Sequence, residues 1–78
     1  LRANQINVVS SRLRDAKNLP CTAKIRYNHP GAAATVTHLD TGEARVRLHV
    51  PQRAITPGQA AVFCQDDLVL GGGWIARD

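Results

Sequence analysis

The side chains that could do chemistry in this 78-residue chain are few and widely spaced. Two cysteines, Cys21 and Cys64, stand far apart and form no C-x-x-C pair. Zinc needs about four ligands at compact spacing, but the histidines fall singly in what we expect to be separate segments: His29, His38 and His49. The sequence therefore predicts two buried thiols and no metal site, with a disulfide between the cysteines as the alternative.

Three consecutive glycines, Gly71 to Gly73, form the most unusual short motif. Glycine is costly to order, so three in a row require a physical reason. They match neither G-x-G-x-x-G nor G-x-x-x-x-G-K-[ST], and no helical pattern follows them. We expect a bent or bulged strand where another backbone passes too close for a Cβ, and we keep a phosphate-binding loop as the alternative. Trp74 is then expected to fill the space that the glycines leave.

Basic side chains give the strongest indication of a partner. The net charge is +4, and eight of the ten cations are arginines, whose planar fork suits phosphate. The charge is uneven, because residues 1–39 carry six cations and one acid while residues 40–78 carry four cations and five acids. A polyanion such as nucleic acid is therefore a candidate partner, although many small basic domains bind no particular anion.

Two alternating segments carry the cations that we expect to face solvent. In "TAKIRYN", Lys24 and Arg26 share the polar face of a half-buried strand. In "EARVRLHV", Arg45 and Arg47 share the polar face of another strand. We predict that these four side chains are exposed on one contiguous face.

The strand that holds Arg45 and Arg47 is expected to form a hairpin with "AAATVTHL", turning at "DTGE" with the central Thr-Gly as its tip. In this register His38 lies opposite Arg45, and Val36 lies opposite Arg47, on the solvent face. The core-facing pairs are then Leu39 with Ala44, Thr37 with Val46, and Thr35 with Leu48.

Short strands dominate the remaining pattern, and the only helical candidate is a single turn in "SSRLRDA", capped by Ser10 or Ser11. "QAAVFC" and "LVL" are apolar on both faces, so we expect central strands joined by a tight turn at residues 65–67, preceded by a type II turn at Pro57-Gly58. We predict an all-β fold, a small closed or nearly closed antiparallel barrel of about six strands. The strands are expected near residues 5–9, 21–28, 33–39, 43–50, 59–65 and 68–75.

The size and ends of the chain suggest one domain, residues 1–78, cut from a longer protein, since the chain starts at Leu1 and contains no methionine. A domain this small has a thin core, which leaves little room for a large buried active site. The opening segment lacks the apolar stretch of a signal peptide, and no apolar run approaches the roughly 20 residues that span a bilayer. We expect a soluble intracellular domain.

Several motifs together resemble the closing segment of the tRNA-specific 2-thiouridylases, the tRNA-uridine 2-sulfurtransferases that thiolate the wobble uridine. They are "LRANQINVVS", "CTAKIRYNHPGAAATV", "PQRAITPGQAAVF" and "VLGGGWI", and they cover nearly the whole chain. The chain departs from the family at Val9, at Cys64 and at residues 65–66, where the family usually has tryptophan, tyrosine and an Asp-Gly or Asn-Gly turn.

The resemblance implies that this chain is the C-terminal β-barrel, similar to those of elongation factors, of a three-part transferase. The parent enzyme would use ATP to adenylate the uridine and two catalytic cysteines to deliver persulfide sulfur, received from a sulfur-relay donor protein. Neither the family's ATP loop nor its cysteine motifs occur here. The barrel alone is therefore expected to have no catalytic residue, metal or cofactor, to bind no ATP and to thiolate nothing, inside a cytoplasmic parent.

For the barrel itself, the resemblance implies tRNA binding. The alternation, with these cations projecting outward, makes Lys24, Arg26, Arg45 and Arg47 the expected RNA-binding residues. One alternative is a structural module that packs on the catalytic and central domains without touching RNA; another is an enzyme that binds a flavin or nucleotide at the glycines. The few aromatic side chains are expected in the core, which leaves backbone and shape contact as the mode of RNA binding. They are Tyr27, Phe63 and Trp74.

Overall fold

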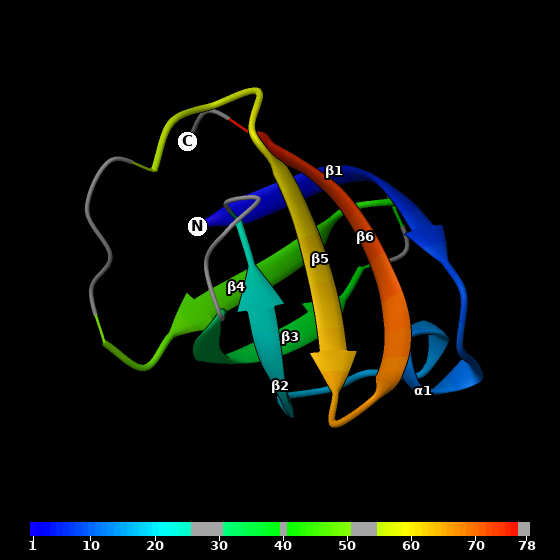
Figure 1. The fold of residues 1–78 in the computed structure, drawn as a ribbon. Helices are drawn as coiled ribbons and strands as arrows, with labels where there is room; N and C mark the ends of the chain where they lie inside the picture. Colours follow the sequence, from blue (N-terminus) through cyan, green and yellow to red (C-terminus); the bar gives the residue numbers. More distant parts are fainter. Residues whose placement is uncertain (26–30, 40, 51–54, 77–78) are drawn as a thin grey trace.

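Six strands make up most of the folded chain. The computed structural model describes residues 1–25, 31–39, 41–50 and 55–76. The elements, shown in Figure 1, are β1 (Arg2–Val8), α1 (Ser11–Arg14), β2 (Leu19–Lys24), β3 (Ala32–His38), β4 (Ala44–Leu48), β5 (Ala60–Gln65) and β6 (Leu68–Ala76).

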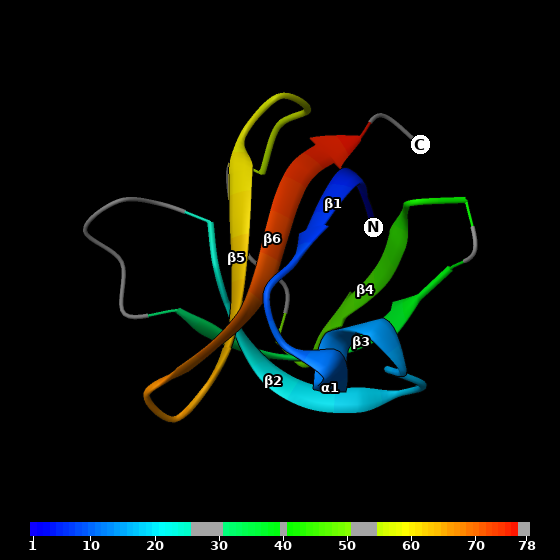
Figure 2. The ribbon, with the colours of Figure 1, turned by 90° about the vertical axis from the view of Figure 1, so that its right-hand side faces the viewer.

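The strands close into a barrel in the order β1-β4-β3-β2-β5-β6, with β6 pairing back onto β1. Every neighbouring pair is antiparallel. Figures 1 and 2 show β1 and β6 running side by side to complete the wall. The predicted all-β barrel of six strands is confirmed, and closure leaves no unpaired edge along the wall.

Small side chains fill much of the barrel interior. Six alanines among the described residues are buried, and the largest fully buried side chain there is that of Phe63. Interior positions of a small barrel often combine small and large residues in this way. The other large buried side chains are Leu13, Val36, Val46, Leu70 and Ile75.

Helix α1 lies across one end of the barrel and packs against β1, β3 and β6 (Figure 2). Ser10 is its N-cap, with the side-chain oxygen accepting a hydrogen bond of 3.2 Å from the backbone N–H of Arg12. The predicted single capped turn is confirmed. Leu13 on this turn is fully buried, so the helix supplies part of the core.

The pairing of β3 with β4 is shifted by one residue from the expected register. Val36 lies opposite Val46, and both side chains are buried. The expectation that Val36 faces solvent was wrong, and Thr37, expected in the core, is only half-buried. Thr35 is buried, as expected, but its hydroxyl is hydrogen-bonded to His49, and the faces of β4 were predicted correctly. A slip of one residue moves every side chain of a strand to its other face. The outward pairs are Thr35 with Arg47 and Thr37 with Arg45.

The loop of this hairpin explains the shift. The backbone N–H of Leu39 donates to the carbonyl of Glu43 at 2.8 Å, so three residues rather than two lie between the paired positions. Gly42, the last of the three, has a φ of +79°. Three-residue hairpin loops place a residue with positive φ at this position, and glycine adopts that conformation without a steric penalty.

The two other predicted turns are confirmed. At Pro57-Gly58 the backbone N–H of Gln59 donates to the carbonyl of Thr56 at 3.4 Å, and the glycine has a φ of +92°. Strands β5 and β6 are joined by two residues, of which Asp66 has a φ of +51°. Positive φ at the first position is typical of the tight turns that match the twist of a hairpin.

Candidate nucleic-acid interface

Three arginines project from the outer surface of β1 and β4. Ala3 lies opposite Ala44, and both are fully buried, so their neighbours along each strand point outward. Arg2 lies directly opposite Arg45, and Arg47 is two residues further along β4 on the same face. We call Arg2, Arg45 and Arg47 the arginine row.

An ion pair engages one end of the arginine row. Arg2 forms an ion pair with Glu43 at 3.2 Å, in which both side chains are partly exposed, so the pair adds little stability. Within the described part of the chain, Arg45 and Arg47 have neither a hydrogen-bond partner nor an ion-pair partner. Both side chains are exposed, and their guanidinium groups can donate hydrogen bonds to an external anion.

Two threonine hydroxyls of β3 and the imidazole of His49, which follows β4, lie beside the arginine row. The Thr35 hydroxyl is hydrogen-bonded to Nε2 of His49 at 2.7 Å. The Thr37 hydroxyl accepts from the backbone N–H of Asn18 at 2.9 Å. Because Thr35 and Thr37 pair with Arg47 and Arg45, this outer face is polar across both strands.

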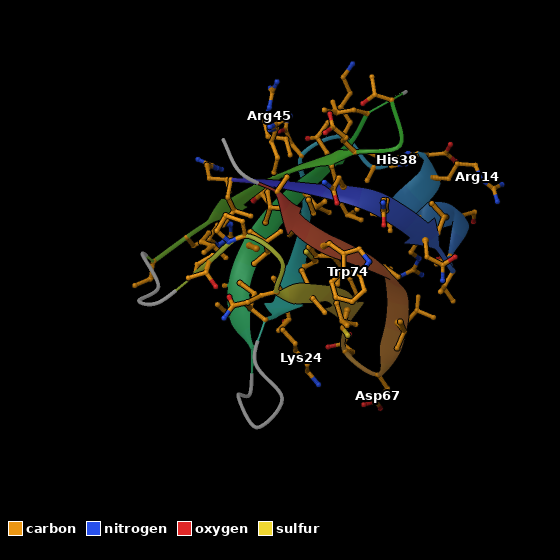
Figure 3. All side chains as sticks on the ribbon, turned by 90° about the horizontal axis from the view of Figure 1, so that it is seen from above. Arg14, Lys24, His38, Arg45, Asp67 and Trp74 are labelled. Carbon is orange, nitrogen blue, oxygen red and sulfur yellow. The ribbon has the colours of Figure 1, made fainter. Side chains whose placement is uncertain are left out.

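The four cations predicted to bind RNA do not share one face. Arg45 and Arg47 are exposed, as predicted, and so is Lys24. Strand β3 lies between β2 and β4, however, and Figure 3 shows Lys24 and Arg45 extending from opposite sides of the barrel. The prediction of one contiguous face was wrong for Lys24, because the barrel wall curves between the two strands. Arg26 lies outside the described residues.

Arg2 was not among the predicted RNA-binding residues, although it completes the row. Strand β1 was expected to begin at residue 5 but begins at Arg2. The pairing of β1 with β6 shifts between Asn4 and Asn7, and Gln5 in this interval has a φ of +50°. This bulge breaks the alternation of the segment, so the outward direction of Arg2 could not be followed from the strand's later residues.

The three glycines stand where neighbouring backbone passes close, as predicted. A Cβ on Gly72 would lie 2.6 Å from the carbonyl oxygen of Ala61, and one on Gly73 would lie 2.6 Å from that of Asn4. At Gly71, which has a φ of +153°, a Cβ would collide with the carbonyl oxygen of Asn7 and with Leu13. Strand β6 also shifts register against β5 beside this point. The bend is confirmed, and each of the three positions lacks room for a Cβ.

The aromatic side chains divide between the inside and the outside of the barrel. Phe63 is fully buried, as predicted, whereas Trp74 is 48% exposed, so the expectation that it fills the core was wrong. Val62 and Val69 are also exposed, although their strands were expected to be buried on both faces. In a closed barrel the outer face of every strand is open to solvent unless another element covers it. Tyr27 lies outside the described residues.

The cysteines lie on neighbouring strands, Cys21 on β2 and Cys64 on β5, as free thiols. Cys64 is buried and Cys21 is half-buried. Burial, and secondarily the proximity of Cys64, raises the pKa of Cys21 from 9.0 to about 11. The Cys21 thiol is therefore protonated at neutral pH, the opposite of what a sulfur nucleophile needs. Among the described residues, no three His, Cys, Asp or Glu side chains come together as a metal site would need.

Comparison with known proteins assigns a family. The profile of the aminomethyltransferase β-barrel domain matches residues 1–75. The tRNA-specific 2-thiouridylase MnmA of Lachnoclostridium phytofermentans is 42% identical over 78 residues, and that of Roseiflexus castenholzii is 46% identical over 78 residues. These alignments cover 99% and 100% of this chain but 21% of each relative.

A third relative, MnmA of Halalkalibacterium halodurans, is 47% identical over 75 residues, which is 96% of this chain and 20% of that protein. The chain thus spans about a fifth of the length of the relatives that it matches. The described residues include no helix long and apolar enough to cross a membrane. The chain belongs to the aminomethyltransferase β-barrel domain family, and its relatives in that family are tRNA-specific 2-thiouridylases.

Proposed function

We propose that this chain is the tRNA-binding accessory barrel of a tRNA 2-thiouridylase. The observation that carries the proposal is the arginine row: Arg2 and Arg45 are direct neighbours on β1 and β4, and Arg47 extends the row along β4. Like charges directly opposite each other destabilise a sheet. An anion bound across them would offset this repulsion.

The chemistry of the row suits the RNA backbone. An arginine guanidinium donates two parallel hydrogen bonds to a phosphate, and the neighbouring strands hold the groups in fixed positions. The row itself contains no aromatic ring on which a base could stack. We therefore propose contact with phosphates and with the shape of the tRNA, without base reading.

The chemical step is assigned to the rest of the parent enzyme. There ATP would activate the wobble uridine, and persulfide sulfur from a donor protein would replace its oxygen. Two features of the barrel support this division. The close packing of Gly71 against the Asn7 carbonyl and Leu13 explains the glycine without a ligand, and the Cys21 thiol is held protonated. An enzyme that modifies tRNA in this way is expected in the cytoplasm.

The runner-up function is a packing module whose basic face is only solvated. A titration of the full parent enzyme with tRNA at several salt concentrations separates the two. If each phosphate contact contributes about −0.7 to −0.9 to the log–log salt slope, the three arginines contribute roughly −2 to −3. The double variant Arg45→Gln, Arg47→Gln should weaken binding and reduce the slope by roughly 1.5 to 2.

Lys24→Gln is the matched control, because Lys24 is an exposed cation on the opposite side of the barrel. The affinity of the Lys24→Gln enzyme for tRNA and the salt slope of its binding should stay at the wild-type values. A double arginine variant that binds tRNA with unchanged affinity and slope would show that the face is merely solvated. A loss in Lys24→Gln equal to that of the double variant would show a general charge effect and would also reject the interface.

A further inference from the structure

A shallow groove of about 340 Å³ runs over the outer surface of β1, β5 and β6. Its floor is the backbone of Gly71, Gly72 and Gly73, which have no side chains to fill it. Trp74 lies on the same strand, and Figure 3 shows its indole on the outside of the barrel. The other residues that line the groove are Gln5, Asn7, Val9, Ala60, Ala61, Val62 and Val69.

The exposed apolar side chains of the barrel gather at this groove. Six large apolar residues among those described are exposed, and four of them line it: Val9, Val62, Val69 and Trp74. Single exposed apolar residues are normal on a soluble protein, but a contiguous group marks an interaction surface. Trp74 is 48% exposed in this structure. Tryptophan is among the residues that contribute most to binding energy when an interface buries them.

The charge pattern selects the kind of partner. None of the eleven residues that line the groove is charged. One cation stands at its margin, since Lys24 on β2 lies directly opposite Val62 on β5. The arginine row lies on β4, the neighbour of β1 away from β6, and at the first residue of β1. A polyanion would gain little from the uncharged groove, whereas an apolar protein surface would bury the indole and the valines together.

The closed wall restricts how such a partner can bind. Because every strand is paired on both sides, no edge is open for a partner to add a strand. A partner must therefore insert side chains between Trp74 and the valines, over the glycine floor. The amides of Gln5 and Asn7, both exposed, would lie at the polar rim of that contact.

We propose that this groove docks the barrel onto another part of the same longer polypeptide, through an apolar and uncharged surface of that part. The inference rests on the proposed function, in which the chain is one domain of a longer enzyme, and on the relatives' length, of which this chain matches about a fifth. The barrel then has two working surfaces. The groove faces the rest of the enzyme, and the arginine row faces the RNA.

Cysteine reactivity in the full parent enzyme tests the proposal. Three single variants are made in it: Val62→Cys in the groove, Arg47→Cys in the arginine row and Thr41→Cys at the exposed tip of the β3–β4 hairpin as the open reference. Each is treated with a neutral maleimide, with and without tRNA, and the labelled peptide is followed by mass spectrometry. Each rate is divided by the rate of the same peptide in denaturant, and circular dichroism checks that each variant is folded.

Without tRNA, the Val62→Cys thiol should react at least tenfold more slowly than the Thr41→Cys thiol. Equal rates would show an open groove and overturn the proposal. Protection of the Val62→Cys thiol only after tRNA is added would assign the groove to RNA and also overturn it. A third outcome is that the Val62→Cys thiol reacts slowly with maleimide but tRNA does not protect the Arg47→Cys thiol. This result would support the docking surface and reject the proposed RNA-binding function.

Discussion

Arg2 on β1 and Arg45 on β4 lie directly opposite each other in the barrel wall. An unfavourable pair of this kind costs a sheet about 0.2–1 kcal/mol. Glu43, which pairs with Arg2 at 3.2 Å, offsets part of this repulsion. Two positive charges thus stand side by side in the barrel wall.

Replacing Arg45 by threonine should therefore separate stability from binding. Threonine suits a strand and removes the repulsion, so the free energy of unfolding should stay the same or rise by a few tenths of a kcal/mol. The tRNA affinity should fall, and the salt slope should decrease by about 0.7–0.9. Thermal melts and tRNA titrations measure the two effects. A variant that loses more than about 1 kcal/mol of stability while binding normally would show that Arg45 has a structural role.

Alanine at Gly71 should destabilise the barrel without a specific effect on RNA binding. The new Cβ would meet the carbonyl oxygen of Asn7 and the side chain of Leu13, and the backbone has a φ of +153°. We expect a loss of about 1–3 kcal/mol in the free energy of unfolding. Gly42→Ala is the control, because Gly42 also has positive φ, +79°, but a Cβ there meets nothing within 4 Å.

The difference between the two glycine variants gives the cost of the close backbone approach at Gly71 together with the greater strain of its φ of +153°. Chemical denaturation of both variants gives this difference, and it should be positive. A Gly71→Ala protein that melts like the wild type but no longer binds tRNA would show that the glycines hold a ligand.

The Cys21 thiol should react slowly with alkylating reagents at neutral pH. Its pKa is raised from 9.0 to about 11, so at pH 8 the thiolate is about 100-fold scarcer than for a thiol of pKa 9.0. The alkylation rate should rise about tenfold per pH unit until the pH nears 11. Iodoacetamide labelling with peptide mass spectrometry measures this profile, and a rate that levels off near pH 9 would contradict it.

The raised pKa of Cys21 also predicts how the stability of the fold changes with pH. Since the folded pKa of Cys21 lies above the unfolded value, its contribution to stability is fully present below about pH 9 and is lost as the pH rises toward 11. Cys21→Ser should remove this part of the alkaline destabilisation. Melts between pH 8 and pH 11 test the expectation.

Truncating Leu13 should show how much α1 contributes to the core. Leu13 is fully buried and comes from a helix of only four residues. Leu13→Ala should cost about 2–5 kcal/mol through the lost transfer energy and the cavity left behind. Arg12→Ala on the same turn is exposed and should cost far less. Similar losses of unfolding free energy in both variants would show that the stability depends on the helix as a whole and not on the buried leucine.

The strands and turns of this barrel could be predicted because their signals are local. Alternation located β2, β3 and β4, and Pro57-Gly58 and the Asp pair located two turns. The register of the β3–β4 hairpin was wrong because "DTGE" fits loops of two or three residues equally well, and only the pairing of Leu39 with Glu43 in the structure decides between them.

The errors at the candidate sites have a different origin, since they depend on which strands are neighbours. A strand with apolar residues on both faces does not show which face is outside, so Trp74 and Val62 were placed in the core. Lys24 and Arg45 looked equivalent until the strand order put β3 between them. The bulge at Gln5 hid the direction of Arg2.

The pairing of β1 with β6 has a consequence for the folding rate. These strands stand at opposite ends of the sequence, yet Arg2 pairs with Ala76, so this seam closes the longest loop in the barrel. Forming contacts between residues so distant in sequence costs the chain the most conformational entropy and slows folding. We expect the seam to form after the transition state, so weakening it should speed unfolding and leave the folding rate nearly unchanged. The two arms of a chevron plot for Ile75→Val would show this, and a slower folding arm would place the seam in the nucleus instead.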